Sequence, residues 1–410
     1  MPSPAPEHPG LFIRDPYRYS DAMLIIPPVL VECLQCFDGR QTELDLRAAL
    51  VRLTNDLEVS EIGQHLIRTL DDAGFLENES FERMRGEREQ EFRDGAVRMP
   101  AHAGSAYPAD TEEARAVITE YMDGAAQVQA AADGDLFAIA APHVSPSGGW
   151  RSYRAAYSKL RPEHASRTFV ILATSHYGQP EKFGLTRKPF VTPLGETATE
   201  TGMVDWLVQR AGDAVLMEDF CHSFEHTVEL QVIFLQHVLG PDVRILPILC
   251  GPYARSLYGS GQPEEDDSVK RFLEALAELR EREAGRLFWI LGVDMAHMGQ
   301  RYGDGFKALA GAGAMTEVGE RDEQRIACIQ AGDAGGFWEL VRENRDDLKW
   351  CGSSPFYTFL KAMEGRAGSP AMRGELLEYE QWNIDEASVV SFAGMAFSQP
   401  GGGSRLILPG

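Results

Sequence analysis

Three histidines lie just beyond apolar, strand-like runs of the sequence. "FAIAAPH" ends at His143, "FVILATSH" ends at His176, and "FWILGVDMAH" ends at His297. In an open α/β sheet the ligand pocket lies beyond the carboxyl ends of the strands. Taken singly, each histidine could be a core residue bonded to a backbone carbonyl. Because only 10 of the 410 residues are histidines, three in this position indicate a shared site.

The third of these runs also carries an acid. Asp294 and His297 stand three positions apart in "LGVDMAHMG". A carboxylate and an imidazole at this spacing can be metal ligands, proton carriers or ordinary buried polar groups. The residues alone leave these three roles open.

A further histidine cluster occurs in "HSFEHTVELQVIFLQ", which contains His222, Glu225, His226 and Glu229. We expect these residues near the start of a helix, where positions three and four apart share a face. The string also fits H-x-x-E-H, in which two histidines bind zinc and the glutamate is the base of a protease. A zinc protease of this kind would leave the histidines at the strand ends without a function.

Among the six cysteines, Cys351 has the most distinctive setting. "LKWCGSSPFYTFLKAM" predicts a turn that leads into a helix, where backbone N–H groups and the helix dipole favour a thiolate. Cys351 is therefore a ligand or nucleophile candidate, and its alternative role is that of a small apolar residue at a helix start. Cys33 and Cys36 form a C-x-x-C in "VLVECLQCF", but we expect both on the buried face of a helix. We expect all six as free thiols, because they are few and scattered.

The elements that would position these residues alternate along the chain. Apolar runs predict the strands "LFAIAA", "RTFVILA", "VRILPIL", "LFWILG" and "ASVVSFAGMAF". Helical spacing occurs in "TEEARAVITEYM", "TGMVDWLVQRAG", "HTVELQVIFLQHVL", "DSVKRFLEALAELRERE" and "DEQRIACIQAG". This alternation is typical of an α/β domain with a largely parallel or mixed sheet.

The length of 410 residues predicts two domains. We expect a small, mostly helical domain over 1–84, a charged linker over 85–96 and an α/β domain over 97–398. Residues 399–410 are expected to be a flexible tail. The signatures "FDGR" and "LIRTLDDAGFLE" of the first domain resemble the winged-helix domain of the PqqD-like family, which binds leader peptides by strand addition. A plain packing or dimerisation module is the alternative.

Charge restricts the partners. Lysine and arginine number 39 against 62 aspartates and glutamates, which gives a net charge of −23. This charge repels phosphate backbones and anionic lipid, so we expect neither unaided nucleic-acid binding nor membrane binding. The N-terminus lacks the features of a secretory signal, and no stretch reaches 18 uninterrupted apolar residues. We therefore expect a cytoplasmic protein.

From about residue 97 to 397 the chain resembles the Memo family, which bacteria carry as AmmeMemoRadiSam system protein B. Seven elements occur in the family's order: "MPAHAGSAYPAD", "APH", "TSHYG", "TPLGE", "HSFEHTVELQVIFLQ", "GVDMAHMG" and "WCGSSPF". The resemblance implies a fold similar to that of class III extradiol dioxygenases, which bind non-haem iron through two histidines and a carboxylate. Memo proteins have a cysteine in place of the carboxylate.

Carried over by motif, the resemblance implies His143, His176 and Cys351 as metal ligands. It places Asp294, His297 and His222 in the same pocket, with His297 as acid/base and Asp294 as its orienter or as an auxiliary ligand. A His–His–Cys set suits iron(II) or copper. Departures occur in "APHVSPSGGW", at Tyr177 and at Met298, and these change pocket walls more than ligands. The substrate therefore cannot be transferred from a relative.

These observations predict a Memo-like metal-dependent oxidoreductase that acts on a small molecule or a modified group. The alternative from another class is a non-enzymatic adaptor. Its Memo-like pocket would recognise a peptide or metabolite, and its N-terminal domain would dock a protein partner.

Overall fold

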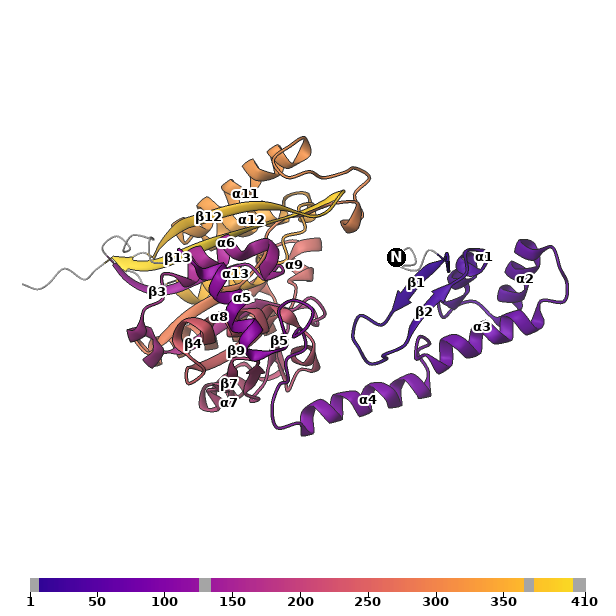
Figure 1. Cartoon of the computed structure of the whole chain (residues 1–410), viewed down its shortest axis with the longest axis horizontal. Helices are drawn as coiled ribbons and strands as arrows, with labels where there is room; N and C mark the ends of the chain where they lie inside the picture. The colour runs from indigo at the N-terminus through magenta and orange to yellow at the C-terminus, as the bar shows by residue number, and fades with distance from the viewer. Residues whose placement is uncertain (1–6, 125–133, 365–371, 401–410) are drawn as a thin grey trace, which may run out of the picture. The chain divides into compact units, whose positions relative to one another are not determined.

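The chain forms two compact units in a computed structural model, which describes residues 7–124, 134–364 and 372–400. The first unit is Met1–Gly95 and the second is Ala96–Gly410; Figure 1 colours the first in indigo to violet. Among the described residues, every helix is too short or too polar to cross a membrane. Most of the expected tail, 399–410, lies outside the described residues.

The first unit is a short hairpin followed by helices. Its elements are β1 (Leu11–Arg14), β2 (Met23–Ile26), α1 (Pro28–Val31), a 3-10 helix (Glu32–Phe37), α2 (Glu43–Thr54), α3 (Ser60–Asp72) and α4 (Glu79–Asp94). β1 and β2 pair antiparallel. A capping box of Thr42 and Asp45 starts α2. After α3, Gly74 adopts the positive φ of 73° that a turn at this point needs.

The core of the first unit is small and apolar. Leu46 and Leu50 of α2 pack with Leu66 and Leu70 of α3, and Cys33 is buried among them. The segment of Cys33 and Cys36 is a 3-10 helix, in which Cys33 is buried as expected but Cys36 is only half-buried.

The charged segment before the second unit is helical. Asn78 caps α4 by accepting hydrogen bonds from the N–H groups of Ser80 and Phe81. The expected boundary near residue 84 falls inside this helix, and the division into units lies between Gly95 and Ala96. The charges of 85–96 therefore belong mostly to a continuous helix, where residues of opposite charge can pair along the surface.

The second unit is built on one mixed sheet of 11 strands. The strands are β3 (Gly134–Ala141), β4 (Thr168–Thr174), β5 (Phe183–Leu185), β6 (Phe190–Thr192), β7 (Gly195–Thr199), β8 (Val215–Met217), β9 (Arg244–Cys250), β10 (Leu287–Gly292), β11 (His297–Gly299), β12 (Arg373–Asp385) and β13 (Ser388–Pro400). The main order is β11-β13-β3-β10-β4-β9-β5-β8. At its centre β3, β10, β4 and β9 run parallel, so their carboxyl ends lie at one edge.

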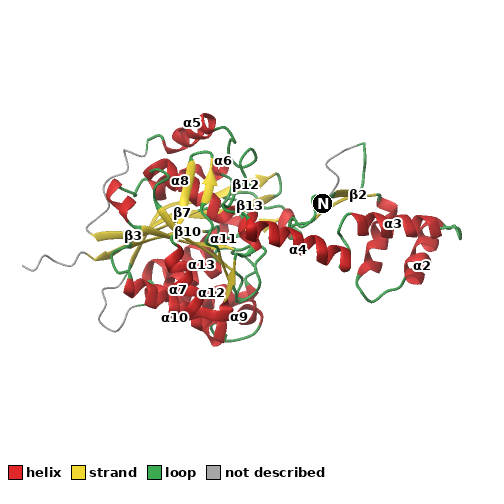
Figure 2. Ribbon diagram, turned by 90° about the horizontal axis from the view of Figure 1, so that it is seen from below, coloured by secondary structure: helices red, strands yellow, loops and turns green. Residues whose placement is uncertain are grey.

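Helices cover both faces of this sheet, as Figure 2 shows. The helices are α5 (Thr111–Met122), α6 (Pro146–Tyr157), α7 (Thr201–Ala211), α8 (His226–Leu239), α9 (Ala254–Tyr258), α10 (Asp267–Arg282), α11 (Ala314–Ala331), α12 (Ala334–Arg342) and α13 (Ser353–Met363). Residues of α5, α6 and α8 form one apolar cluster with one face of the sheet. Residues of α7, α10, α11, α12 and α13 form the other. The central strands are consequently buried on both faces, which explains their continuous apolar runs.

All five predicted strands of this unit are present, and so are the five helices predicted from helical spacing and the helix expected after Cys351. The prediction missed β5, β6, β8 and β11, which have only three residues each, and β7, which has five. It also missed β12, whose sequence "RGELLEYEQWNID" is half-exposed and rich in charge, and α6, which contains the glycine pair of "PSGGW".

Candidate metal centre

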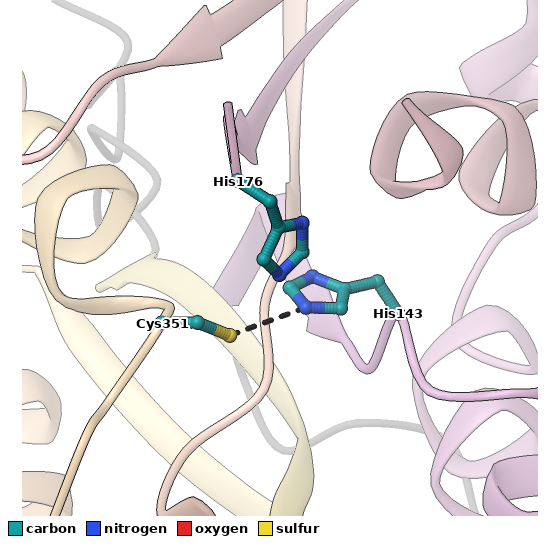
Figure 3. A group of neighbouring side chains, drawn as sticks. All are labelled: His143, His176 and Cys351. Carbon is teal, nitrogen blue, oxygen red and sulfur yellow. Dashed lines mark hydrogen bonds between the residues drawn. The ribbon is translucent and has the colours of Figure 1, made fainter. Parts of the chain in front are cut away.

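The carboxyl ends of β3 and β4 deliver two histidines to one place. His143 follows β3 by two residues, and His176 follows β4 by two residues. β10 lies between these strands and pairs in parallel with both, which fixes the two exits at the same edge. Cys351 reaches this edge from the turn before α13. Figure 3 shows the three side chains converging.

The donor atoms of His143, His176 and Cys351 lie within 4.8 Å of one another. The Sγ of Cys351 is 3.2 Å from the Nε2 of His143. His143 is buried, whereas Cys351 is half-buried. Two imidazoles and one thiol in this arrangement could hold a metal ion.

Both histidines have the outer hydrogen bond that is typical of metal ligands. The Nδ1 of His143 lies 3.0 Å from the carbonyl oxygen of Gly292. The Nδ1 of His176 lies 3.1 Å from the carboxylate of Glu225. A donor N–H at Nδ1 leaves the lone pair on Nε2, and such partners fix the orientation of a ligating ring. The residues present therefore fit a metal ion.

Burial and neighbouring charge set the protonation of this group. Burial lowers the pKa of His143 well below its usual 6.5, and the nearby His176 and His226 lower it further. Burial alone would also lower the pKa of His176, but Glu225 and Cys351 raise it well above 6.5. Burial raises the pKa of the Cys351 thiol. This outweighs the expected influence of the helix start, so deprotonation of Cys351 would accompany metal binding.

Asp294 fixes the loop of His143 rather than the ring of His297. Its Oδ1 accepts hydrogen bonds from the backbone N–H groups of His143 and Val144 at 2.9 and 3.2 Å. Its Oδ2 lies 3.4 Å from the Nε2 of His143. Burial raises the pKa of Asp294 to about 7. Asp294 therefore lies beside His143 and contacts its backbone.

His297 is oriented by backbone carbonyls. Its Nδ1 lies 2.9 Å from the carbonyl oxygen of Met295 and 3.1 Å from that of Lys349. Its ring packs edge-on against Tyr302, with a centroid distance of 5.0 Å. Burial lowers the pKa of His297 to about 4, so the neutral ring carries its lone pair on Nε2.

The structure brings His226, in place of His222, to the ligand group. The ring of His226 lies 5.2 Å from that of His143 and 5.1 Å from that of His176. The ring of His222 lies elsewhere: its Nε2 is 3.0 Å from the carbonyl oxygen of Gly184, and it packs edge-on against Phe190. His222 is buried.

A repeated spacing explains this difference. The segment reads H-x-x-E twice, at His222 to Glu225 and again at His226 to Glu229. The sequence gives no means of choosing between the two registers. In the structure, Glu225 caps α8, which begins at His226, whereas His222 belongs to the preceding 3-10 helix, Phe220–Ser223. The helix face that an H-x-x-E-H zinc site requires is therefore not formed by His222 and His226.

Glu225 is the residue that links the histidines, a role that the sequence did not indicate. Its carboxylate accepts hydrogen bonds from the backbone N–H groups of His176 and His226 at 2.8 and 3.0 Å. The Nδ1 of His226 lies 3.0 Å from its Oε1. Burial would raise the pKa of Glu225, but the two histidines hold it well below 4.5.

Two buried polar networks hold the surrounding segments. In one, Glu229 of α8 accepts hydrogen bonds from Arg98 and Tyr107, and Arg98 also donates to the carbonyl oxygens of His222 and Glu225. In the other, Asp322 of α11 accepts hydrogen bonds from Trp350, Tyr379 and Ser391. Because Trp350 precedes Cys351 and the Oγ of Ser391 accepts from the N–H of Ala296, the second network joins the segments of Cys351 and Asp294.

The chain is similar to proteins from archaea and bacteria. Residues 98–396 match the family described as Memo-like protein. A MEMO1 family protein of Aquifex aeolicus is 27% identical over 94% of this chain and 95% of its own. MEMO1 family proteins of Thermococcus kodakarensis and Archaeoglobus fulgidus are each 30% identical over 73% of this chain and 99% of their own. The Aquifex match is longer than the second unit, so it extends into the first.

Proposed function

Because the chain belongs to the Memo-like family, we propose that it binds a redox-active metal ion at His143, His176 and Cys351 and oxidises a small molecule or a modified group. One observation carries the proposal. Three metal-binding side chains from segments far apart in the sequence converge. A hydrogen bond holds the Nδ1 of each histidine, so that Nε2 is the atom that would bind the metal.

Iron(II) is the first choice of metal and copper is the second, because imidazole and thiolate are good ligands for both. When bound, the metal would supply one-electron chemistry and open positions for a small ligand. Three protein ligands leave such positions available. The fold similar to that of extradiol dioxygenases, expected from the sequence, is consistent with this chemistry.

The residues around the donors would orient a bound substrate and hold the ligands in place. His297 is neutral and its Nδ1 faces two backbone carbonyls, so its Nε2 can accept a hydrogen bond from a bound substrate, although a pKa of about 4 makes it a weak base at neutral pH. Asp294 holds the backbone of His143 in place. His222 has no chemical step in this proposal, because Gly184 and Phe190 surround its ring.

Metal analysis tests the ligand assignment. The wild type and a His143→Ala/His176→Ala/Cys351→Ala variant would be purified with iron or copper present, and metal per chain would be measured. We expect the triple variant to lose the metal. A His65→Ala/Cys328→Ala variant is the control, because these residues lie on α3 and α11. Equal metal content in the wild type and the triple variant would refute the assignment.

We also propose that the first unit docks a protein or peptide partner, as a winged-helix-like module could. Large apolar side chains on this unit support the proposal, because Met23, Val29, Leu44 and Leu57 are at least half exposed. The full chain and a Met23→Glu/Leu44→Glu variant would be compared in crosslinking and affinity capture. Equal capture of every partner by both proteins would rule out this surface.

A further inference from the structure

We propose that His176, Glu225 and His226 form a second metal-binding set, which shares His176 with the His143–His176–Cys351 group. One donor atom from each of the three residues lies within 4.8 Å of the other two. This set joins two imidazoles and a carboxylate, and it contains no sulfur. The inference goes beyond the proposed function, which uses only the first set.

The burial and hydrogen bonds of the Glu225 carboxylate suit it to bind a metal ion. Its side chain is 1% exposed, and backbone N–H groups of His176 and His226 hold both of its oxygens. Ligating carboxylates in proteins are hydrogen-bonded in this way. Its nearest side-chain partners are the imidazoles of His176 and His226. A divalent cation bound among these three side chains would supply the positive charge that a buried carboxylate requires.

The two histidines leave access for an ion. Their rings are nearly parallel, with an interplanar angle of 10° and a centroid distance of 5.1 Å. The Nδ1 atoms of His176 and His226 lie 3.1 and 3.0 Å from the same oxygen of Glu225. Side-chain exposure is 27% for His176 and 33% for His226, so water can reach the set and complete the coordination.

The shared histidine allows only one set to be filled at a time. A neutral imidazole has its hydrogen on one ring nitrogen and its free lone pair on the other. With the lone pair on Nε2, His176 can serve the set that contains Cys351. With the lone pair on Nδ1, it can serve the set that contains Glu225. The two sets are thus alternatives that differ by the tautomer of one residue.

Ligand chemistry divides metal ions between the two sets. The set with Cys351 can hold copper(I) as well as iron(II), because it includes a thiolate, whereas two histidines and one carboxylate favour iron(II) and similar divalent ions over copper(I). The set at Glu225 would therefore bind divalent ions without a contribution from sulfur.

Cobalt(II) binding to the full chain tests this inference. Metal-free wild type and the variants Cys351→Ser, Cys351→Ser/His143→Ala, Cys351→Ser/Glu225→Gln and Cys351→Ser/His226→Ala would be titrated with cobalt(II). Bound metal would be measured by equilibrium dialysis, and thiolate ligation by its charge-transfer absorption. Cys351→Ser/His102→Ala is the matched control, because the ring of His102 contacts that of His226 but lies outside the set. Circular dichroism would check that each variant is folded.

We expect Cys351→Ser to bind about one cobalt ion per chain without charge-transfer absorption. The additional replacement of His143 or His102 should change the cobalt affinity by no more than about twofold. Loss of Glu225 or His226 should weaken it at least tenfold; the partly exposed His226 provides this test even if the Glu225 variant does not fold. The inference is overturned if Cys351→Ser binds no cobalt, or if the His143 variant loses it while the His226 variant retains it. A wild type that binds iron or copper through Cys351 would in that case still support the proposed function.

Discussion

The Sγ of Cys351 lies 3.2 Å from the Nε2 of His143, although 208 residues separate them in the sequence. Three features produce this distance. β3 ends just before His143, the turn before α13 carries Cys351, and the N–H of Gly352 donates a 3.0 Å hydrogen bond to the carbonyl oxygen of Asp294.

Replacing Cys351 with alanine should weaken copper(I) binding without unfolding the protein. Loss of an outer-shell partner typically costs 10–100-fold in affinity, so loss of a ligand should cost at least about 100-fold. Cys328→Ala is the control, because Cys328 is a half-buried thiol on α11. Competition with a chelator would measure both affinities, and similar affinities for the two variants would argue against Cys351 as a ligand.

Gly352→Ala should displace Cys351. A Cβ at this position would lie 2.6 Å from the carbonyl oxygen of Asp294 and 2.8 Å from the Cβ of Val293, which neither backbone can avoid without moving. We expect a loss of about 1–3 kcal/mol in the free energy of unfolding together with weaker metal binding. Gly305→Ala is the matched control, since a Cβ there meets open space. Urea unfolding and metal titration of both variants would provide the comparison; unchanged metal affinity in Gly352→Ala would show that this contact does not position Cys351.

His222→Gln should change the pH dependence of stability but not the metal content. Burial lowers the pKa of His222 from 6.5 to about 4 in the folded chain. The folded state then binds fewer protons than the unfolded state between these values, so stability falls as the pH drops from 6.5 to 4, by about 3 kcal/mol in total. A glutamine can still donate to Gly184 and does not titrate.

Urea unfolding of the wild type and His222→Gln at pH 7 and pH 5 would measure this effect. We expect a smaller loss of stability in the variant over this interval. Metal content should equal that of the wild type. If the variant loses the metal while it remains folded, His222 does contribute to metal binding.

Arg98→Met should be strongly destabilising. Arg98 and Glu229 are both completely buried and form an ion pair, and removal of one partner leaves an unpaired buried charge, at a cost of about 3–5 kcal/mol. The double variant Arg98→Met/Glu229→Gln should recover part of this loss, because glutamine is neutral and can still accept from Tyr107.

Free energies of unfolding from urea titrations would compare the wild type, both single variants and the double variant. Arg85→Met is the surface control, with an expected loss below about 1 kcal/mol, because Arg85 pairs with Glu82 in solvent. Additive losses in the double variant would show that the charges of Arg98 and Glu229 are not coupled.

The positions of His143, His176 and Cys351 were predictable because each follows from a local pattern. A continuous apolar run ends before each histidine, and parallel strands bring their carboxyl ends to one edge. The turn before α13 is equally local. The family resemblance then singled out these three residues as ligands, and their donor atoms are close enough to hold an ion.

Tertiary structure alone decided the partners of the remaining polar residues. The sequence did not distinguish between the two H-x-x-E spacings. Because α8 starts at His226, it is His226 that lies beside His143, and His222 does not. Asp294 contacts the backbone of His143, which lies 151 residues away, instead of its sequence neighbour His297. A strand's apolar period is encoded residue by residue, whereas a hydrogen bond between distant loops depends on how every intervening element packs. The sequence by itself therefore determined which edge of the sheet carries the site, and the packed fold determined which side chains meet there.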